Sequence, residues 1–399
     1  MRKRVLLSLL IILFVGFLFS SDYKTDLTKY VAIGDSLTAG YQSGGLVADY
    51  QAFSFPNIIA KQLGISDFEQ PLISSPGIPP LMQLVSLNPI TFTTASTYGS
   101  PLNLSLPRAY DNLGIPGATL YTALYPNYDS LTNPFYNIVL RKLGNAVQQA
   151  LSLNPKLITF WLGNNEVLGA VGAGKVILGV TIFPPDTYAQ LLDQALAMLK
   201  TSGAKIAIAN IPSVTQIPFV TALSIYITNP QTNEPIIGPD GKPITYIGPQ
   251  GPMTEGWYIT LKGLPYILQG YGIPVALGGN GEPLPDGVTL SPEEVSQLNS
   301  YVEQYNTIIS DAAKKYNAAL VDVNALFDNV YKNGFKIGGV TFTLDYLTGG
   351  LFSYDGVHPS SLGYAIIANE FIKVINKTYD YEIPLYSYKE LFDYGNGGE

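Results

Sequence analysis

The sequence has no cysteine among its 399 residues and only one histidine, His358. Without cysteine the chain can form no disulfide, offers no thiolate nucleophile and cannot be lipidated on an N-terminal cysteine. A single histidine and no cysteine also disfavour a catalytic metal, although a calcium site made only of carboxylates stays open. We therefore predict that the protein needs no cofactor and no metal.

Charged residues are scarce, at 13% of the sequence, and acidic ones outnumber basic ones. The 22 Lys and Arg against 30 Asp and Glu give a formal net charge of −8 at pH 7. A negative surface disfavours nucleic acid and anionic lipid headgroups, because both carry negative charge themselves. Hydrophobic residues make up 47% of the chain, which is enough to bury a large core. We expect a folded protein that does not bind nucleic acid.

The first 21 residues have the pattern of a targeting segment. Arg2-Lys3-Arg4 precede an apolar run over residues 5–19, which is shorter than the roughly 20 residues that span a bilayer. This favours a signal peptide over residues 1–21, although Leu18 and Phe19 are large for a cleavage site, so an uncleaved N-terminal anchor remains the alternative. We predict an exported protein that is periplasmic, secreted or N-terminally anchored, and peripheral association with a membrane is compatible with this.

Short apolar runs alternate with helical patterns along the remaining chain. This alternation predicts an α/β fold with a mostly parallel sheet and helices on both faces. After Ser291, the sequence Ser-Pro-Glu-Glu is a capping box that predicts a helix start at Pro292. The predicted strands are 30–33, 156–162, 205–209 and 319–323, and the predicted helices are 53–63, 135–153, 188–200, 292–316 and 361–375.

Two segments, near residues 66–108 and 213–290, do not follow this alternation and are rich in turn residues such as Gly238-Pro239-Asp240-Gly241. Long irregular segments inside compact domains are usually lids or binding loops. We therefore predict that residues 22–399 form a single domain with two insertions that act as lids or substrate loops.

His358 must perform any histidine-dependent chemistry, because it is the only imidazole in the chain. It follows Asp355 by three residues in a polar turn before the last predicted helix. The carboxylate can therefore fold back onto the ring Nδ1, fix the tautomer and leave Nε2 free to accept a hydroxyl proton.

Ser36 is the candidate nucleophile. In Gly34-Asp35-Ser36-Leu37 it directly follows a predicted buried strand, where a hydroxyl group is exposed to a neighbouring base. Acyl transfer also needs donors for the developing oxyanion. Two predicted loops can supply them: residues 112–117, whose glycines permit close approach of a backbone N–H, and residues 163–166, which offer a side-chain amide.

Taken in order, these motifs resemble the four blocks of the SGNH (GDSL) hydrolase family. The blocks are Gly34-Asp35-Ser36-Leu37, Asn112 with Gly117, Gly163-x-Asn165 and Asp355-x-x-His358-Pro359, and the resemblance spans about residues 30–375 outside the two insertions. It implies a flavodoxin-like three-layer α/β/α sandwich and a serine esterase or lipase. One departure is Glu166, which stands where the family commonly has aspartate.

By the same resemblance, Ser36 would be the nucleophile, His358 the base and Asp355 the carboxylate that orients it. The Ser36 N–H, the Gly117 N–H and the Asn165 side-chain amide would form the oxyanion hole. Ser-Asp-His is also the chain order of α/β-hydrolases, but their Gly-x-Ser-x-Gly elbow is missing here.

Each motif has a simpler interpretation when it is taken alone. A Gly-Asp-Ser-Leu tetrapeptide is common in ordinary loops, His358 could cap the helix that follows Pro359, and the two glycine-containing loops could be plain turns. Residues 169–175 imitate a phosphate-binding loop, but Val176 replaces the Ser or Thr that would reach Mg²⁺. The four motifs together, each at the end of a predicted strand, favour the hydrolase.

The motifs leave the substrate open among small-molecule, lipid, glycan and thioester compounds. A carbohydrate acetyl esterase with the same triad and a non-catalytic exported binding protein that keeps the fold are the alternatives. The oligomeric state is not predicted.

Overall fold

The computed structural model describes residues 27–395, apart from residues 88, 130, 230 and 233. The segment predicted as a signal peptide or anchor, residues 1–21, lies outside the described residues. Within the described part of the chain, no helix combines the length and the apolar character that crossing a membrane requires.

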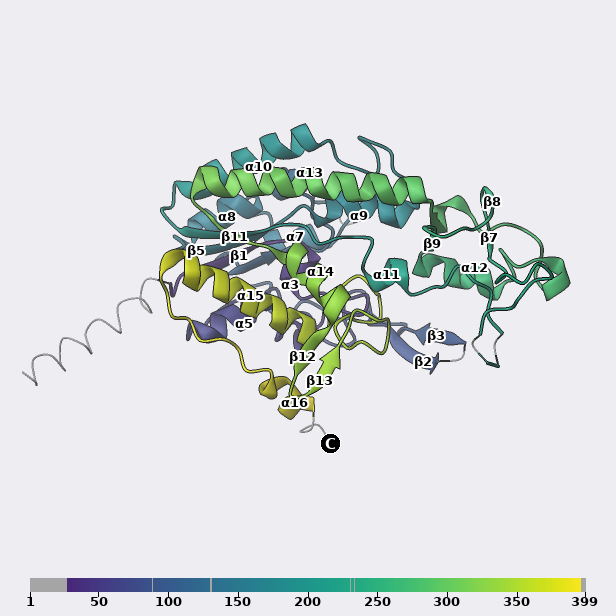
Figure 1. The fold of residues 1–399 in the computed structure, drawn as a ribbon. Coiled ribbons are helices and arrows are strands. Elements are labelled where there is room, and N and C mark those ends of the chain that lie inside the picture. The colour runs from purple at the N-terminus through teal and green to yellow at the C-terminus, as the bar shows by residue number, and fades with distance from the viewer. Residues whose placement is uncertain (1–26, 88, 130, 230, 233, 396–399) are drawn as a thin grey trace, which may run out of the picture.

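The core of the molecule is a sheet of five parallel strands in the order β11-β6-β5-β1-β4 (Figure 1). This confirms the predicted α/β class with a parallel sheet. The strands are apolar and almost entirely buried, as expected for a parallel sheet that is covered on both faces. Their bounds are β1 Tyr30–Gly34, β4 Asn112–Gly114, β5 Leu157–Trp161, β6 Lys205–Ala209 and β11 Ala319–Val321.

Alternate side chains of the strands point to two separate hydrophobic cores, which makes the fold a three-layer α/β/α sandwich. Val31 and Ile33 of β1 belong to the larger core, whereas Tyr30 and Ala32 belong to the smaller one. Figure 1 shows α10 and α13 on one side of the sheet and α5 and α15 on the other. The larger core is covered by α6 Leu120–Leu124, α7 Phe135–Leu140, α8 Ala146–Ser152, α9 Asn164–Ala173, α10 Pro185–Lys200 and α13 Pro292–Tyr316, and the smaller by α5 Phe55–Gln62 and α15 Ser361–Tyr379.

The prediction of one helix over residues 135–153 is wrong. The chain forms α7 and α8 instead, because Arg141 and Lys142 have φ of 51° and 60° and leave the right-handed helical region. Asn145 then starts α8 with a capping box in which Gln148 is the partner. At Ser291 the predicted capping box is present, and α13 begins at Pro292 as expected.

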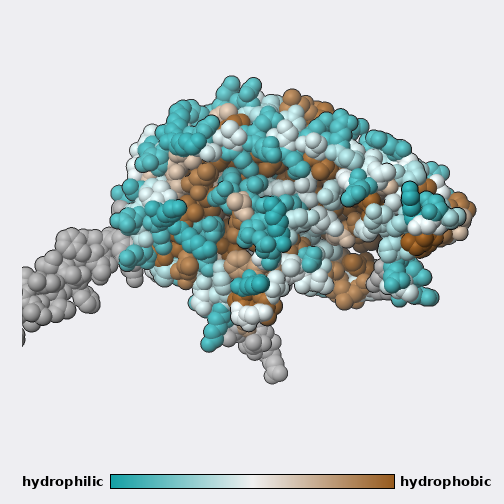
Figure 2. All heavy atoms as spheres, in the orientation of Figure 1, coloured by the Kyte–Doolittle hydropathy of each residue, from teal (hydrophilic) through white to brown (hydrophobic). Residues whose placement is uncertain are grey.

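The segment near 66–108 contains a two-stranded hairpin, β2 Gln83–Leu87 with β3 Ile90–Thr93, which the sequence did not suggest. The segment near 213–290 has a small core of its own, around Met253, Ile259, Leu284 and Val288. Its elements are α11 Pro218–Thr221, β7 Ile247–Gly248, β8 Gly251–Pro252, β9 Tyr258–Ile259, η1 Leu261–Gly263, α12 Leu264–Leu268, η2 Val275–Leu277, η3 Asp286–Val288 and β10 Thr289–Leu290. Figure 1 places α12, β7 and β8 of this segment at the right-hand end of the molecule, where Figure 2 shows hydrophobic and hydrophilic residues side by side on the surface.

The remaining elements of the fold are short helices and one hairpin. They are α3 Ser36–Ala39, α4 Ala48–Gln51, α14 Val323–Asn333, the hairpin of β12 Phe335–Ile337 with β13 Val340–Phe342, and α16 Lys389–Gly395.

Candidate active site

Ser36, Asp355 and His358 lie next to one another at the carboxyl end of the sheet, although 322 positions separate the serine from the histidine. The Ser36 Oγ is 2.8 Å from Nε2 of His358, and Nδ1 of the same ring is 3.0 Å from Oδ2 of Asp355. Because a carboxylate accepts at Nδ1, the proton of the neutral ring belongs there, and Nε2 presents a lone pair to the serine hydroxyl.

The Asp355 carboxylate is held by three backbone N–H groups in addition to the imidazole. Its Oδ1 accepts from Val357 and His358 at 2.9 and 2.8 Å, and its Oδ2 accepts from Gly44 at 2.9 Å. Burial alone would raise the pKa of Asp355, but His358 and these hydrogen bonds outweigh it and hold the pKa below its usual value. The carboxylate therefore stays ionised beside the histidine.

Two residues that contact Asp355 or His358, Gly44 and Tyr41, were not predicted from the sequence. Gly44 is 311 positions away from Asp355 and contributes only a backbone N–H, which leaves no mark in a sequence motif. Tyr41 packs its ring against the His358 imidazole with 4.7 Å between ring centroids. Both residues follow α3, so the turn after Ser36 also supports the other two side chains.

The turn that presents Ser36 depends on Gly34 and Asp35. A Cβ on Gly34 would approach the carbonyl oxygen of Trp161 to 2.7 Å, so only glycine fits at the end of β1. Asp35 caps α3 by accepting the Leu37 N–H at 2.9 Å. The hydroxyl of Ser36 is consequently fixed at the first residue of α3, with 8% of the residue exposed.

The two segments that were predicted to supply oxyanion donors lie beside Ser36. The prediction that both are loops is wrong in part, because residues 112–114 form β4 and residues 164–166 form the first turn of α9. Gly117 has φ of 78°, and its N–H donates to no other group among the described residues. Asn165 donates one amide N–H to the carbonyl of Ala118 at 2.8 Å, which leaves a second N–H available. Asn112 is buried and donates to the carbonyl of Thr38 at 2.9 Å, so its side chain braces the loop instead of facing a substrate.

Two cavities meet at Ser36 and His358. The wide cavity has a volume of about 510 Å³, and its walls include Gly117, Asn165 and the aromatic rings of Tyr41, Tyr98 and Phe135. The narrow cavity has a volume of about 30 Å³, and apart from Ser36, His358 and Asn164 its lining is apolar: Leu37, Leu168, Pro212, Val214, Ile217 and Val357.

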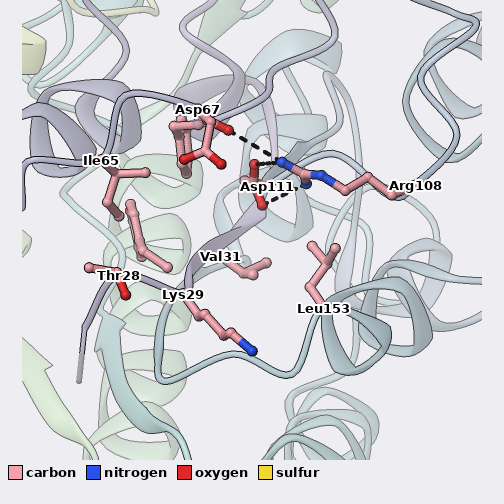
Figure 3. Close-up of a pocket in the computed structure, with 10 residues that line it drawn as sticks. Thr28, Lys29, Val31, Ile65, Asp67, Arg108, Asp111 and Leu153 are labelled. Carbon is pink, nitrogen blue, oxygen red and sulfur yellow. Dashed lines mark hydrogen bonds and ion pairs between the residues drawn. The ribbon is translucent and has the colours of Figure 1, made fainter. Parts of the chain in front are cut away.

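A third cavity, of about 220 Å³, lies around the amino end of β1 (Figure 3). There the Arg108 guanidinium donates to both carboxylate oxygens of Asp111, at 2.9 and 2.8 Å, and to the carbonyl of Asp67 at 3.3 Å. Its lining has no histidine, and its arginine is already paired with a carboxylate. Nor do the described residues contain a group of three or more His, Asp or Glu side chains that could hold a metal.

The sequence matches the family model described as GDSL-like Lipase/Acylhydrolase over residues 30–371. That range covers most of the chain and includes all four motifs. The chain belongs to the GDSL-like lipase/acylhydrolase family. The family's description names lipases and acylhydrolases, and this supports hydrolase activity on esters for the GDSL-like chain.

Solved structures that resemble the GDSL-like chain are distant from it, and no curated protein matches the sequence. A catalytic mutant of Axe2, an acetylxylan esterase from Geobacillus stearothermophilus, is 14% identical, with a TM-score of 0.38 and coverage of 87% of this chain and 93% of that one. A putative GDSL-like lipase from Parabacteroides merdae is 13% identical, with a TM-score of 0.39 and coverage of 87% and 95%. A putative lipolytic protein of the G-D-S-L family from Desulfitobacterium hafniense is also 13% identical, with a TM-score of 0.37 and coverage of 87% and 99%.

The carboxyl groups of Asp35 and Glu166 are buried next to Ser36 and Asn165, respectively. Burial raises the pKa of Asp35 to about 6, although the amide of Asn164, at 2.8 Å, partly offsets this. Burial likewise raises the pKa of Glu166 to about 7, against the lowering effect of the Leu120 N–H, which donates to its Oε1 at 2.6 Å. Glu166 thus ties α9, the helix that carries Asn165, to the start of α6 after Gly117 in this GDSL-like chain.

Replacing Glu166 with glutamine is expected to remove a pH-dependent loss of stability. The pKa of Glu166 is raised from 4.5 to about 7 in the folded state, so the unfolded chain releases its proton first and stability falls as the pH rises through this range. The free energy of unfolding of the variant, relative to that of the wild type, should therefore increase by about 3 kcal/mol between about pH 4.5 and about pH 8.

Urea unfolding of both proteins at the two pH values measures this difference. Glutamine keeps an oxygen for the Leu120 N–H, so the comparison isolates the ionisation of residue 166. Asp35 also titrates in this range, but it is present in both proteins, so its contribution to the difference cancels. Glu303→Gln, on the exposed face of α13, serves as the matched control. A difference between wild type and Glu166→Gln that does not change with pH would contradict the assignment.

Proposed function

We propose that the protein is a serine hydrolase that cleaves carboxylic esters through an acyl-enzyme on Ser36. The observation that carries this proposal is the continuous path from the Ser36 hydroxyl through His358 to Asp355, at 2.8 and 3.0 Å. Membership of the GDSL-like lipase/acylhydrolase family supports the same reaction class.

In the first half of the reaction, the Ser36 Oγ forms a bond to the ester carbonyl carbon while its proton moves to Nε2 of His358. Asp355 stabilises the imidazolium that results, because its carboxylate stays ionised and bonded to Nδ1. When the tetrahedral intermediate collapses, the bond between the carbonyl carbon and the alcohol oxygen breaks, and His358 returns the proton to the departing alcohol.

In the second half, His358 removes a proton from a water molecule whose oxygen attacks the acyl-enzyme. The bond between the acyl group and Ser36 then breaks, the serine recovers its proton from His358, and a carboxylic acid leaves. The chain's own residues perform every proton transfer in this cycle.

We assign the stabilisation of both tetrahedral intermediates to the N–H groups of Ser36 and Gly117 and to the side-chain amide of Asn165. Asn165 and Gly117 line the same cavity as Ser36, and the Ala118 carbonyl fixes the Asn165 amide. Asn165→Ala is expected to lower kcat by about 10²–10³-fold with little change in KM, because the lost hydrogen bond forms mainly in the transition state. Steady-state kinetics on a p-nitrophenyl ester measure both constants, and a kcat within tenfold of the wild type would remove Asn165 from this role.

The direct test of the proposal is labelling with a fluorophosphonate probe, which reacts only with an activated serine. The wild type should take up one probe per chain, and Ser36→Ala should take up none while keeping the wild-type unfolding curve. Ser213→Ala provides a control for labelling of other serines and should react like the wild type. An unlabelled wild type would favour a non-catalytic binding protein with this fold.

A further inference from the structure

The narrow cavity and the wide cavity share Ser36 and His358, but their remaining walls come in part from opposite sides of β1. Gly117 in the wall of the wide cavity follows β4, on one side of β1, whereas Val214 and Ile217 in the wall of the narrow cavity follow β6, on the other side. The acyl group and the alcohol group of an ester bound at Ser36 can therefore occupy different cavities.

We propose that the narrow cavity receives the acyl chain of the ester and limits it to about four carbons, with Val214 and Ile217 setting the limit. This inference rests on the proposed esterase function and names its substrate class as esters of short carboxylic acids. The alcohol half occupies the wide cavity, whose volume of about 510 Å³ accepts a much larger group.

The chemistry of the cycle assigns the two halves to the two cavities. The alcohol must leave after the first step, which suits the larger cavity, where polar groups such as Asn133 and Thr132 are also present. The acyl group stays bonded to Ser36 until water attacks, and a small apolar enclosure excludes other water from it in the meantime. The narrow cavity is mainly apolar, and Pro212, Val214 and Ile217 are apolar walls that it does not share with the wide cavity.

The size of the narrow cavity sets the chain length. A volume of about 30 Å³ leaves room for only a few non-hydrogen atoms, since one water-sized sphere occupies about 10–15 Å³. Beyond the carbonyl carbon, which stays at Ser36, this is room for the remaining carbons of an acetyl, propionyl or butyryl group.

The wall of the narrow cavity is held in place by the loop that carries the histidine. The Phe219 N–H of α11 donates to the carbonyl of Gly356 at 2.8 Å, between Asp355 and His358 in the sequence. Ile217 caps α11, and both Val214 and Ile217 are buried. The hydrogen bond thus connects the segment that carries Val214 and Ile217 to the loop that carries His358.

The test is the dependence of kcat/KM on acyl length, with p-nitrophenyl acetate, butyrate, hexanoate and octanoate as substrates. For the wild type, kcat/KM should fall by about tenfold or more from butyrate to hexanoate, since a pocket rejects one or two extra methylenes by such factors. Val214→Ala and Ile217→Ala should each raise the ratio of hexanoate to butyrate by about tenfold.

Val220→Ala is the matched control, because Val220 is a buried valine of the same segment that lines neither cavity. It should keep the wild-type ratio. If Ile217→Ala fails to fold, Ile217→Val should shift the ratio in the same direction by a smaller factor. Equal rates for hexanoate and butyrate in the wild type, or shifts no larger than that of Val220→Ala, would overturn the inference.

Fluorophosphonate labelling separates failure of this inference from failure of the proposed function. A wild type that is labelled at Ser36 and hydrolyses all four esters equally well refutes the acyl limit and leaves the esterase intact. A wild type that is neither labelled nor active refutes both.

Discussion

His358→Ala is expected to lower kcat for ester hydrolysis by about 10⁴–10⁶-fold, the largest effect of any single substitution together with that of Ser36→Ala. The reason is that the chain contains no second histidine that could replace the lost base. The Ser36 hydroxyl, whose contact with Nε2 is 2.8 Å, would then keep its proton and be a poor nucleophile. Steady-state kinetics with a p-nitrophenyl ester measure the loss.

The double variant Ser36→Ala/His358→Ala provides the control for this result. Groups that act as one unit give losses that do not add, so the double variant should be no slower than Ser36→Ala alone. Multiplicative losses, or a His358→Ala enzyme within tenfold of the wild type, would show that the two side chains act separately.

Asp355→Asn is expected to lower kcat by about 10⁴-fold, with a smaller change in KM. The shape of the side chain is preserved, but an amide can donate to Nδ1 and then favours the tautomer with the proton on Nε2. That ring nitrogen faces Ser36 and could no longer accept the hydroxyl proton. The same kinetic assay measures the loss in the variant.

The matched control for this variant is Asp345→Asn, which changes an exposed aspartate ten positions earlier in the chain. It should leave kcat near the wild-type value. A loss of less than about tenfold in Asp355→Asn would mean that another group orients the histidine.

The layers of the fold could be predicted because strands that are buried on both faces have continuous apolar runs in the sequence. The predicted strands at 30–33, 156–162 and 205–209 differ from β1, β5 and β6 by no more than one residue at each end. The error at residues 135–153 arose where the apolar spacing continues across a break. Arg141 and Lys142 adopt left-handed backbone conformations there, which the periodicity of the side chains does not reveal.

The meeting of Ser36 with His358 was predictable from the four ordered motifs and not from the sheet alone. Ser36 follows β1 of the parallel sheet, whereas His358 lies between the separate β12–β13 hairpin and α15. The supporting contacts were not predictable. Gly44 reaches Asp355 through its backbone, and Val214 and Ile217 of the narrow cavity come from a segment without periodic structure. Substrate specificity therefore depends on segments whose residue spacing does not reveal their structure, whereas the reacting groups lie in short sequence motifs.

The separation of Ser36 from His358 by 322 positions has a consequence for the order of events during folding. Strand β1 pairs with β4 and β5 on either side, and the loop before α15 must close over its end before the serine gains a base. Turnover should therefore appear only after both ends of the chain have docked, later than the bulk of the helical signal in a refolding experiment. Activity would thus measure the completion of folding, and a chain that ends before His358 would have no base for Ser36.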